Sequence, residues 1–188
     1  MTITVVGIGG SLRAGSQSER ALRIALDGAA DEGAATSVIT GEDLVLPFYD
    51  IAMSERTPAA EQLLDAVRAA DGVVIASPGY HGGLSGLVKN ALDYIEDLHA
   101  DGRPYLHGRA VGSIAVAFGW QAAVTTLNQL RTTVHALRGW PTPLGGAVNS
   151  VETKFDEAGG ANEPRVEATL RAIGEQVVDF ARGEAGGD

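Results

Sequence analysis

The chain has no cysteine among its 188 residues. This absence excludes a disulfide framework, thiolate metal sites and a cysteine nucleophile, and it agrees with a reducing compartment. The apolar run at residues 3–8 is too short to span a bilayer, and no basic segment precedes it. We therefore expect an unprocessed cytoplasmic protein without a membrane anchor.

Basic residues are also scarce: the chain has 14 lysines and arginines against 24 aspartates and glutamates, and its formal net charge is −10. Such a protein repels phosphates at long range, so we expect no non-specific binding to nucleic acid or to anionic membranes. A small anionic ligand is still possible, because a nest of backbone N–H groups with one arginine can hold a phosphate on an acidic protein.

Several common site motifs are missing as well. The chain has no complete dinucleotide fingerprint, no Walker lysine, no Gly-x-Ser-x-Gly elbow and no His-Glu-x-x-His pair. The four histidines are scattered, and we expect His99, His107 and His135 to be surface or helix positions without a catalytic role. No metal site is predicted.

Apolar periodicity then alternates between two kinds of segment. Continuous β-branched runs predict strands at residues 2–8, 36–39, 72–77, 109–118 and 142–148. Helical spacing predicts helices at residues 19–31, 57–70, 84–98, 121–138 and 164–182, with a frayed tail at 183–188. Five alternations predict an α/β fold with a five-stranded parallel sheet covered on both faces, in the strand order 2-1-3-4-5. We expect residues 1–188 to form a single domain.

Two Gly- and Ser-rich loops lie where this topology favours a ligand. In open parallel sheets ligands bind beyond the carboxyl ends of the strands, at the point where the strand order reverses. With the order 2-1-3-4-5, that point lies between strands 1 and 3. The loops that follow these strands are residues 9–18 and 78–83, so composition and topology indicate the same place.

The first loop, residues 9–18, has the composition of an anion site. Two glycines allow close approach of the backbone, three serines supply hydroxyl donors, and the following helix presents free N–H groups. Arg13 adds a forked cationic donor that suits phosphate oxygens. The alternative is a plain Gly/Ser turn that ends in a serine N-cap.

The second loop, residues 78–83, has the composition of a site for a flat ring. Pro78 and the glycines bring backbone amides close to a ligand edge, and Tyr80 offers an aromatic face or a hydroxyl. The alternative is a structural turn with a surface tyrosine. Trp120, on the same edge after strand 4, either covers the ring or fills the edge of the core. In the helix at 84–98, Lys89 and Asp93 are spaced to pair, and its wide apolar stripe suits a subunit interface.

At this point a resemblance emerges. The segments that carry it are residues 10–16 (GSLRAGS), 46–50 (LPFYD), 77–83 (SPGYHGG) and 86–93 (GLVKNALD). Together they resemble the NADPH-dependent FMN reductase family, which includes flavin, quinone, azo-dye and chromate reductases. The resemblance covers about residues 2–150. It implies a flavodoxin-like three-layer sandwich, bound FMN, NAD(P)H as hydride donor, and dimers or tetramers built partly on the helix after strand 3.

The resemblance also implies site residues. Those at the phosphate are Ser11, Arg13, Ser16, Gln17 (through its backbone N–H) and Ser18. Those along the flavin ring are Pro78, Gly79, Tyr80, His81 and Gly82, and Gly119 and Trp120 match only loosely. The family often has Asn in place of Ser18 and Glu-Tyr-Asn in place of Gly79-Tyr80-His81, which leaves the favoured electron acceptor open.

In such an enzyme the flavin carries the chemistry and no side chain serves as a catalytic acid or base. The resemblance implies ping-pong transfer from NAD(P)H to flavin and on to a small-molecule acceptor. The first hypothesis is an FMN reductase, with a monooxygenase as a partner that would use the reduced flavin. The second is a quinone, azo or chromate reductase with tightly held FMN. The third is an electron-carrier flavodoxin, although such carriers usually have a Thr-rich phosphate loop, unlike residues 11–18.

Overall fold

The computed structural model of the protein describes residues 2–185. Its sheet has the order β2-β1-β3-β5-β6, with β7 also paired to β5, and all of these pairs are parallel. The strands are β1 (Thr4–Gly9), β2 (Ala35–Thr40), β3 (Gly72–Tyr80), β4 (Gly83–Leu84), β5 (Ala110–Ala117), β6 (Trp140–Pro141) and β7 (Gly146–Asn149). The predicted strand order is therefore confirmed, with the fifth position shared by β6 and β7.

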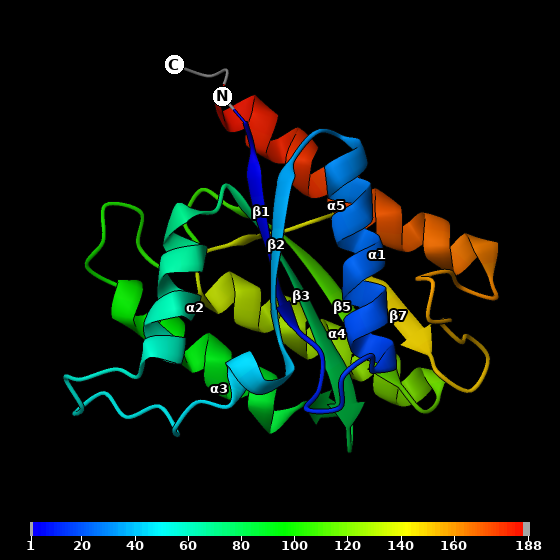
Figure 1. Ribbon diagram of the computed structural model, residues 1–188, viewed down its shortest axis with the longest axis horizontal. Helices are drawn as coiled ribbons and strands as arrows, with labels where there is room; N and C mark the ends of the chain where they lie inside the picture. Colours follow the sequence, from blue (N-terminus) through cyan, green and yellow to red (C-terminus); the bar gives the residue numbers. More distant parts are fainter. Residues whose placement is uncertain (1, 186–188) are drawn as a thin grey trace.

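Helices cover both faces of the sheet and make three layers. They are α1 (Gln17–Asp31), η1 (Gly41–Leu44), α2 (Pro58–Ala69), α3 (Gly86–Asp93), η2 (Tyr94–Leu98), α4 (Trp120–Ala136) and α5 (Pro164–Ala185), of which η1 and η2 are 3₁₀-helices. Figure 1 shows α1 and α5 together on one side of the sheet and α2 and α3 on the other. One buried apolar cluster lies under α1 and α5, and a second lies under α2, α3 and α4.

Local signals in the sequence explain where the helices begin and end. Ser16 caps α1 by accepting a hydrogen bond from the N–H of Glu19, and Thr57 caps α2 in the same way just before Pro58. After α1 the chain turns at Gly33, whose φ of +83° is in the left-handed region that favours glycine. These positions confirm the first two predicted helices to within a few residues.

The segment predicted as a loop at residues 78–83 is instead a β-hairpin. Strand β3 continues through Pro78 and Gly79 to Tyr80, and β4 folds back against it in antiparallel pairing. The two residues of the turn, His81 and Gly82, both have positive φ, at 52° and 82°, as a two-residue hairpin turn of this kind requires. Proline and glycine suggested that the strand ends at residue 77, but pairing with β5 and β4 extends it.

The predicted fifth strand, residues 142–148, is divided in two. Strand β6 pairs with the start of β5, the chain leaves the sheet near Pro143, and β7 rejoins β5 further along. Pro143 has no N–H to donate to a neighbouring strand, and the N–H of Leu144 donates instead to Oε1 of Gln176 in α5, at 3.0 Å. The interruption thus has a local cause.

Two helix ends also differ from the predictions. The predicted helix at 84–98 begins with the N-cap Ser85 and changes from α3 into the 3₁₀-helix η2 at Tyr94. Helix α5 continues to Ala185, beyond the predicted end at Arg182, so residues 183–185 are helical and not frayed. The rest of the expected frayed tail, 186–188, lies outside the described residues. No helix in the described part of the chain is both long and apolar enough to cross a membrane.

Candidate functional site

A cavity of about 480 Å³ lies at the carboxyl edge of the sheet, where β1, β3, β5 and β7 end. This is the edge that the reversal of strand order selects, and it is the lower edge of the sheet in Figure 1. The residues that line it are Ser11, Arg13, Ser16, Gln17, Ser18, Pro78, Gly79, Tyr80, Val116, Ala117, Phe118 and Ser150. The two predicted loops therefore meet in one cavity.

The loop between β1 and α1 is held in shape by its own side chains. The N–H of Ser16 donates to the carbonyl of Arg13 at 3.1 Å, and the carboxylate of Glu19 accepts from the N–H of Gly15 at 2.9 Å. Arg20 donates through Nε to the carbonyl of Gly15 at 2.8 Å. With these groups engaged, the loop presents its remaining donors to the cavity.

Several donors of this loop lie among the residues that line the cavity. The Arg13 side chain is exposed and forms no hydrogen bond or ion pair with a described residue. The hydroxyls of Ser16 and Ser18 are buried and lie 3.3 Å from each other. The N–H groups of Gln17 and Ser18, at the first turn of α1, have no acceptor in the described part of the chain. A buried hydroxyl, a free guanidinium and a helix N-terminus together suit a phosphate group.

The β3–β4 hairpin and the end of β5 form the opposite side of the cavity. Pro78 is buried, Gly79 is partly exposed, and Tyr80 is 56% exposed. A Cβ atom on Gly79 would lie 2.7 Å from Oγ1 of Thr126 and 2.8 Å from Cβ of Ala117. Only glycine fits between α4 and β5 here, so this part of β3 packs closely against both elements, and Gly79 also lines the cavity.

Four of the predicted site residues do not line the cavity. His81 and Gly82 form the turn of the β3–β4 hairpin and are not among the residues that line the cavity. Gly119 and Trp120 begin α4, and the indole Nε1 of Trp120 donates to Oε1 of Glu152 at 2.9 Å. Trp120 is 47% exposed and is not among the residues that line the cavity, and its place over the ring stays a prediction.

Four lining residues were not anticipated. Val116, Ala117 and Phe118 come from the end of β5, and Ser150 follows β7. The hydroxyl and the N–H of Ser150 both donate to the carbonyl of Ala117, at 3.2 and 2.9 Å. A signal was present, because the polar pair 149–150 directly follows an apolar strand at the same edge of the sheet.

Next to the cavity, the long connection after β2 is anchored on α3. Oδ1 of Asn90 accepts from the N–H of Tyr49 at 2.9 Å, and its Nδ2 donates to the carbonyl of Pro47 at 2.9 Å. Arg56 stacks over the ring of Tyr49 and forms a two-point ion pair with Asp97, at 2.6 and 3.0 Å. Hydrogen bonding to Arg56 holds the pKa of Asp97 below its ordinary value.

The strand order, the three layers and the serine-rich loop at the reversal point define a flavodoxin-like α/β protein. Solved structures agree on the fold. The flavoenzyme NAD(P)H:acceptor oxidoreductase FerB from Paracoccus denitrificans matches with a TM-score of 0.78 and 18% identity, over 97% of this chain and 99% of that one.

The sequence comparisons identify the family. The family model for NADPH-dependent FMN reductase matches residues 3–153, and the chain belongs to this family. It is therefore an NAD(P)H-dependent oxidoreductase with FMN as its prosthetic group. The NADPH azoreductase of Bacillus sp. (strain OY1-2) is 28% identical over 68% of this chain and 69% of its own. An NAD(P)H-dependent FMN reductase of Pseudomonas aeruginosa is 29% identical over 81% and 83%.

Proposed function

We propose that residues 1–188 form one FMN-binding domain that passes hydride from NAD(P)H to a small-molecule acceptor by a ping-pong mechanism. The observation that carries the proposal is the cavity of about 480 Å³, in which the free guanidinium of Arg13 and the buried hydroxyls of Ser16 and Ser18 face one space. This donor set fits a phosphate, and the space beyond it continues to the β3 hairpin.

The residues of the cavity divide by role. Arg13, the hydroxyls of Ser11, Ser16 and Ser18, and the N–H of Gln17 hold the phosphate. The backbone of Pro78, Gly79 and Tyr80 lies along the ring, opposite the unanticipated residues of β5. When bound, FMN supplies the hydride chemistry. Among the described residues of the lining, the titratable ones are Tyr80 and Arg13, and in this proposal the protein binds and orients its ligands without a side-chain acid or base.

Val116 and Phe118 give the cavity an apolar wall, and Phe118 is 85% exposed. An apolar aromatic wall favours planar aromatic acceptors by stacking. Flavins, quinones and azo compounds share that shape, and two kinds of relative are named for FMN reduction and for azo reduction. We therefore propose an azo or quinone compound as the second acceptor class, beside free FMN.

The decisive experiment mixes the purified protein with FMN and NADPH and follows NADPH oxidation, first with oxygen alone and then with a panel of acceptors. We expect oxidation that depends on both FMN and acceptor, with parallel lines in double-reciprocal plots, as ping-pong kinetics require. FMN binding without NADPH oxidation would instead indicate an electron carrier, and the reductase proposal would then be wrong.

The phosphate site has its own test in Arg13→Ala. Loss of one charge-assisted hydrogen bond should weaken FMN binding by about 2 kcal/mol, which is roughly 30-fold in Kd. Arg165→Ala is the matched control, because Arg165 is also an exposed arginine and lies in α5, outside the cavity. Equal FMN affinity in the wild type and in Arg13→Ala would remove Arg13 from the site.

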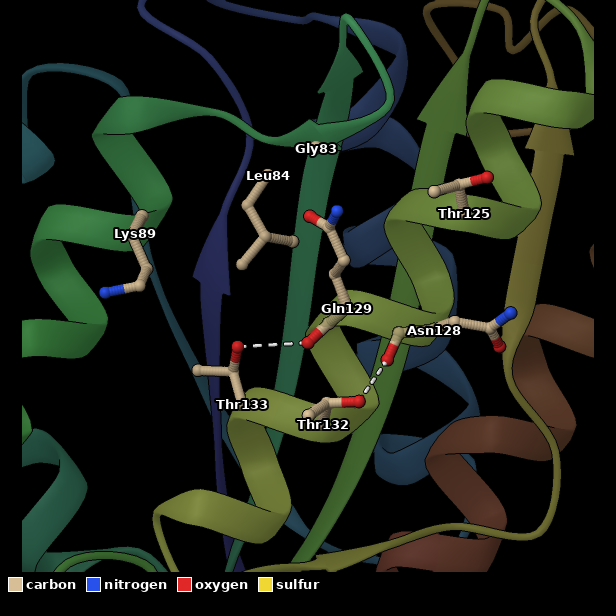
Figure 2. Close-up of a pocket in the computed structure, with 8 residues that line it drawn as sticks. All are labelled: Gly83, Leu84, Lys89, Thr125, Asn128, Gln129, Thr132 and Thr133. Carbon is tan, nitrogen blue, oxygen red and sulfur yellow. Dashed lines mark hydrogen bonds between the residues drawn. The ribbon is translucent and has the colours of Figure 1, made fainter.

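We also propose that the protein forms a homodimer or homotetramer through the groove between α3 and α4. Figure 2 shows this groove, of about 590 Å³, with Leu84 and Lys89 on one side and the side chains of α4 on the other. The hydroxyls of Thr132 and Thr133 donate to carbonyls of their own helix, which leaves their methyl groups for contact. Light scattering after gel filtration tests this, with Thr133→Arg as the disrupting variant. A monomeric wild type would contradict it.

Two further proposals concern the cellular setting. We propose a cytoplasmic location, because NAD(P)H is produced and held inside the cell, and cell fractionation tests it.

We also propose a flavin-dependent monooxygenase as a partner, because the cavity opens to solvent along the exposed residues Tyr80 and Phe118. Stimulation of such an enzyme by the purified protein and NADPH, with no added reductase, would support this partnership.

A further inference from the structure

The indole of Trp120 has one hydrogen-bond acceptor among the described residues. Trp120 is the first residue of α4, and its Nε1 donates to Oε1 of Glu152 at 2.9 Å. Trp120 is only two positions from Phe118, which lines the cavity. This half-exposed indole, two positions in the chain from a residue of the cavity lining, is therefore held by the segment that follows β7.

The acceptor atom on Glu152 is itself fixed by a buried amide. Nδ2 of Asn149 donates to the same Oε1 at 2.7 Å, and Oδ1 of Asn149 accepts from the N–H groups of Gly119 and Val151, at 3.0 and 3.1 Å. Asn149 is 4% exposed. The chain from Gly119 to Trp120 thus rests on Asn149 and Glu152, which together act as one support.

Glu152 acts here as a hydrogen-bond acceptor and not as a member of an ion pair. The nearby Lys154 donates its Nζ to the carbonyl of Ser150 and not to Glu152. Within the described residues, Glu152 has no ion-pair partner, and the hydrogen-bond donors to its carboxylate come from Trp120 and Asn149. A neutral glutamine offers the same oxygen, so the role of this residue can be separated from its charge.

Without the Glu152 carboxylate, the Trp120 indole is more stable in a different, more buried orientation. An indole that loses its hydrogen-bond partner gains by burying its large apolar surface. Phe118, two positions earlier in the chain, is 85% exposed and lines the cavity, so its ring is apolar surface that a freed indole would cover. A rotated Trp120 would narrow the mouth against large planar molecules and would leave it open to small ones.

We propose that Glu152 is a positioning residue that holds Trp120 away from the cavity mouth and so sets the size of acceptor that the enzyme accepts. This inference rests on the proposed function, since it concerns the second substrate of that site. It assigns to the segment after β7 a part in selecting the acceptor, beside its contact with the cavity through Ser150.

The first test is spectroscopic and needs no turnover. In a Trp140→Phe background Trp120 is the only tryptophan, since the chain has two. We measure its quenching by acrylamide without FMN, and its quenching by added FMN. Glu152→Ala should change both, with stronger quenching by FMN as the indole moves toward the ring. Glu152→Gln should give the same quenching as the Trp140→Phe protein in both measurements. The control Glu157→Ala, which removes an exposed carboxylate from the same segment, should do so too.

The second test is kinetic. For Glu152→Ala we expect KM for a bulky azo dye to rise about three- to tenfold, which corresponds to the free energy of one hydrogen bond. Both kcat and KM for the small acceptor ferricyanide should stay unchanged. Glu152→Gln should restore the wild-type KM. In a Trp120→Phe background, Glu152→Ala should have no further effect on KM.

These outcomes separate the inference from the proposed function. A wild-type protein that binds FMN but does not oxidise NADPH contradicts the proposed function, while the quenching of Trp120 still tests its contact with Glu152. An active wild type with unchanged quenching and KM in Glu152→Ala overturns the inference alone. Glutamine behaving like alanine at this position overturns it too, because the hydrogen bond would then not be the cause.

Discussion

The side chain of Gln17 and the backbone of Phe155 form two hydrogen bonds with each other. Oε1 of Gln17 accepts from the N–H of Phe155 at 2.9 Å, and Nε2 donates to its carbonyl at 3.3 Å. Arg20 donates to that same carbonyl at 2.9 Å. The loop between β1 and α1 is thereby tied to a segment 138 residues away, just beyond the part of the chain that the family model matches.

This contact predicts that the Gln17 side chain supports the site without binding the cofactor. Gln17→Ala keeps the backbone N–H but loses both hydrogen bonds, so it should destabilise the protein by about 1–2 kcal/mol. FMN affinity should fall much less than in Arg13→Ala. Urea unfolding and FMN titration measure the two effects, with the exposed Gln62→Ala as control. Equal losses of FMN affinity in Gln17→Ala and Arg13→Ala would contradict this prediction, because the Gln17 side chain would then have to contact the ligand.

The ion pair of Asp97 and Arg56 predicts a dependence of stability on pH. Because Arg56 lowers the pKa of Asp97 in the folded protein, the pair stabilises the fold above the ordinary carboxyl value of about 3.8. This contribution is lost as the pH falls through the lowered pKa. Asp97→Asn should reduce stability at neutral pH and flatten its fall in acid. The same change at Asp65, whose side chain is 75% exposed beside Arg68, should have little effect. Thermal unfolding of the two variants and the wild type, followed from neutral pH down through the lowered pKa of Asp97, measures these effects.

Arg109 is buried, and its hydrogen-bond partners in the described structure are backbone carbonyls. It donates to the carbonyls of Ala70, Tyr105 and Arg68, at 2.9, 3.2 and 3.0 Å, and burial lowers its pKa to about 10. Arg109→Met should destabilise the protein by about 2–4 kcal/mol, because two carbonyls at the end of α2 and the carbonyl of Tyr105 lose their donor. Arg109→Lys should cost less, since it keeps part of the bonding. Urea unfolding checks the order, and a stable methionine variant would contradict it.

Helices α1 and α5 touch at their backbones. A Cβ atom on Gly174 would lie 1.9 Å from the carbonyl oxygen of Ala25. Gly174→Ala should therefore separate the helices and destabilise the protein by about 1–3 kcal/mol, in spite of alanine's higher helix propensity. Gly183, in the same helix, has nothing within 4 Å of its Cβ position. There the same substitution should stabilise the protein by about 0.5–1 kcal/mol. Calorimetry on the two variants should give shifts of opposite sign.

Much of the fold could be predicted because its signals are local. Apolar runs and helical spacing indicated the alternating strands and helices, and right-handed crossovers left the strand order that the structure confirms. The prediction was wrong where a neighbouring strand decides the outcome. Pro78 and Gly79 resemble loop residues, yet they belong to a strand because β5 and β4 supply partners.

By itself the sequence determined the location of the cavity and one side of its chemistry. The loop at residues 9–18 contains its own serines, its arginine and the start of its helix, so residues close in the chain suffice to give it the composition of an anion site. The tertiary structure decided the rest. It brought Ser150 to the end of β5, tied Gln17 to Phe155, and turned Trp120 toward Glu152. Such contacts join residues far apart in the chain, and no local periodicity specifies which partner a side chain reaches.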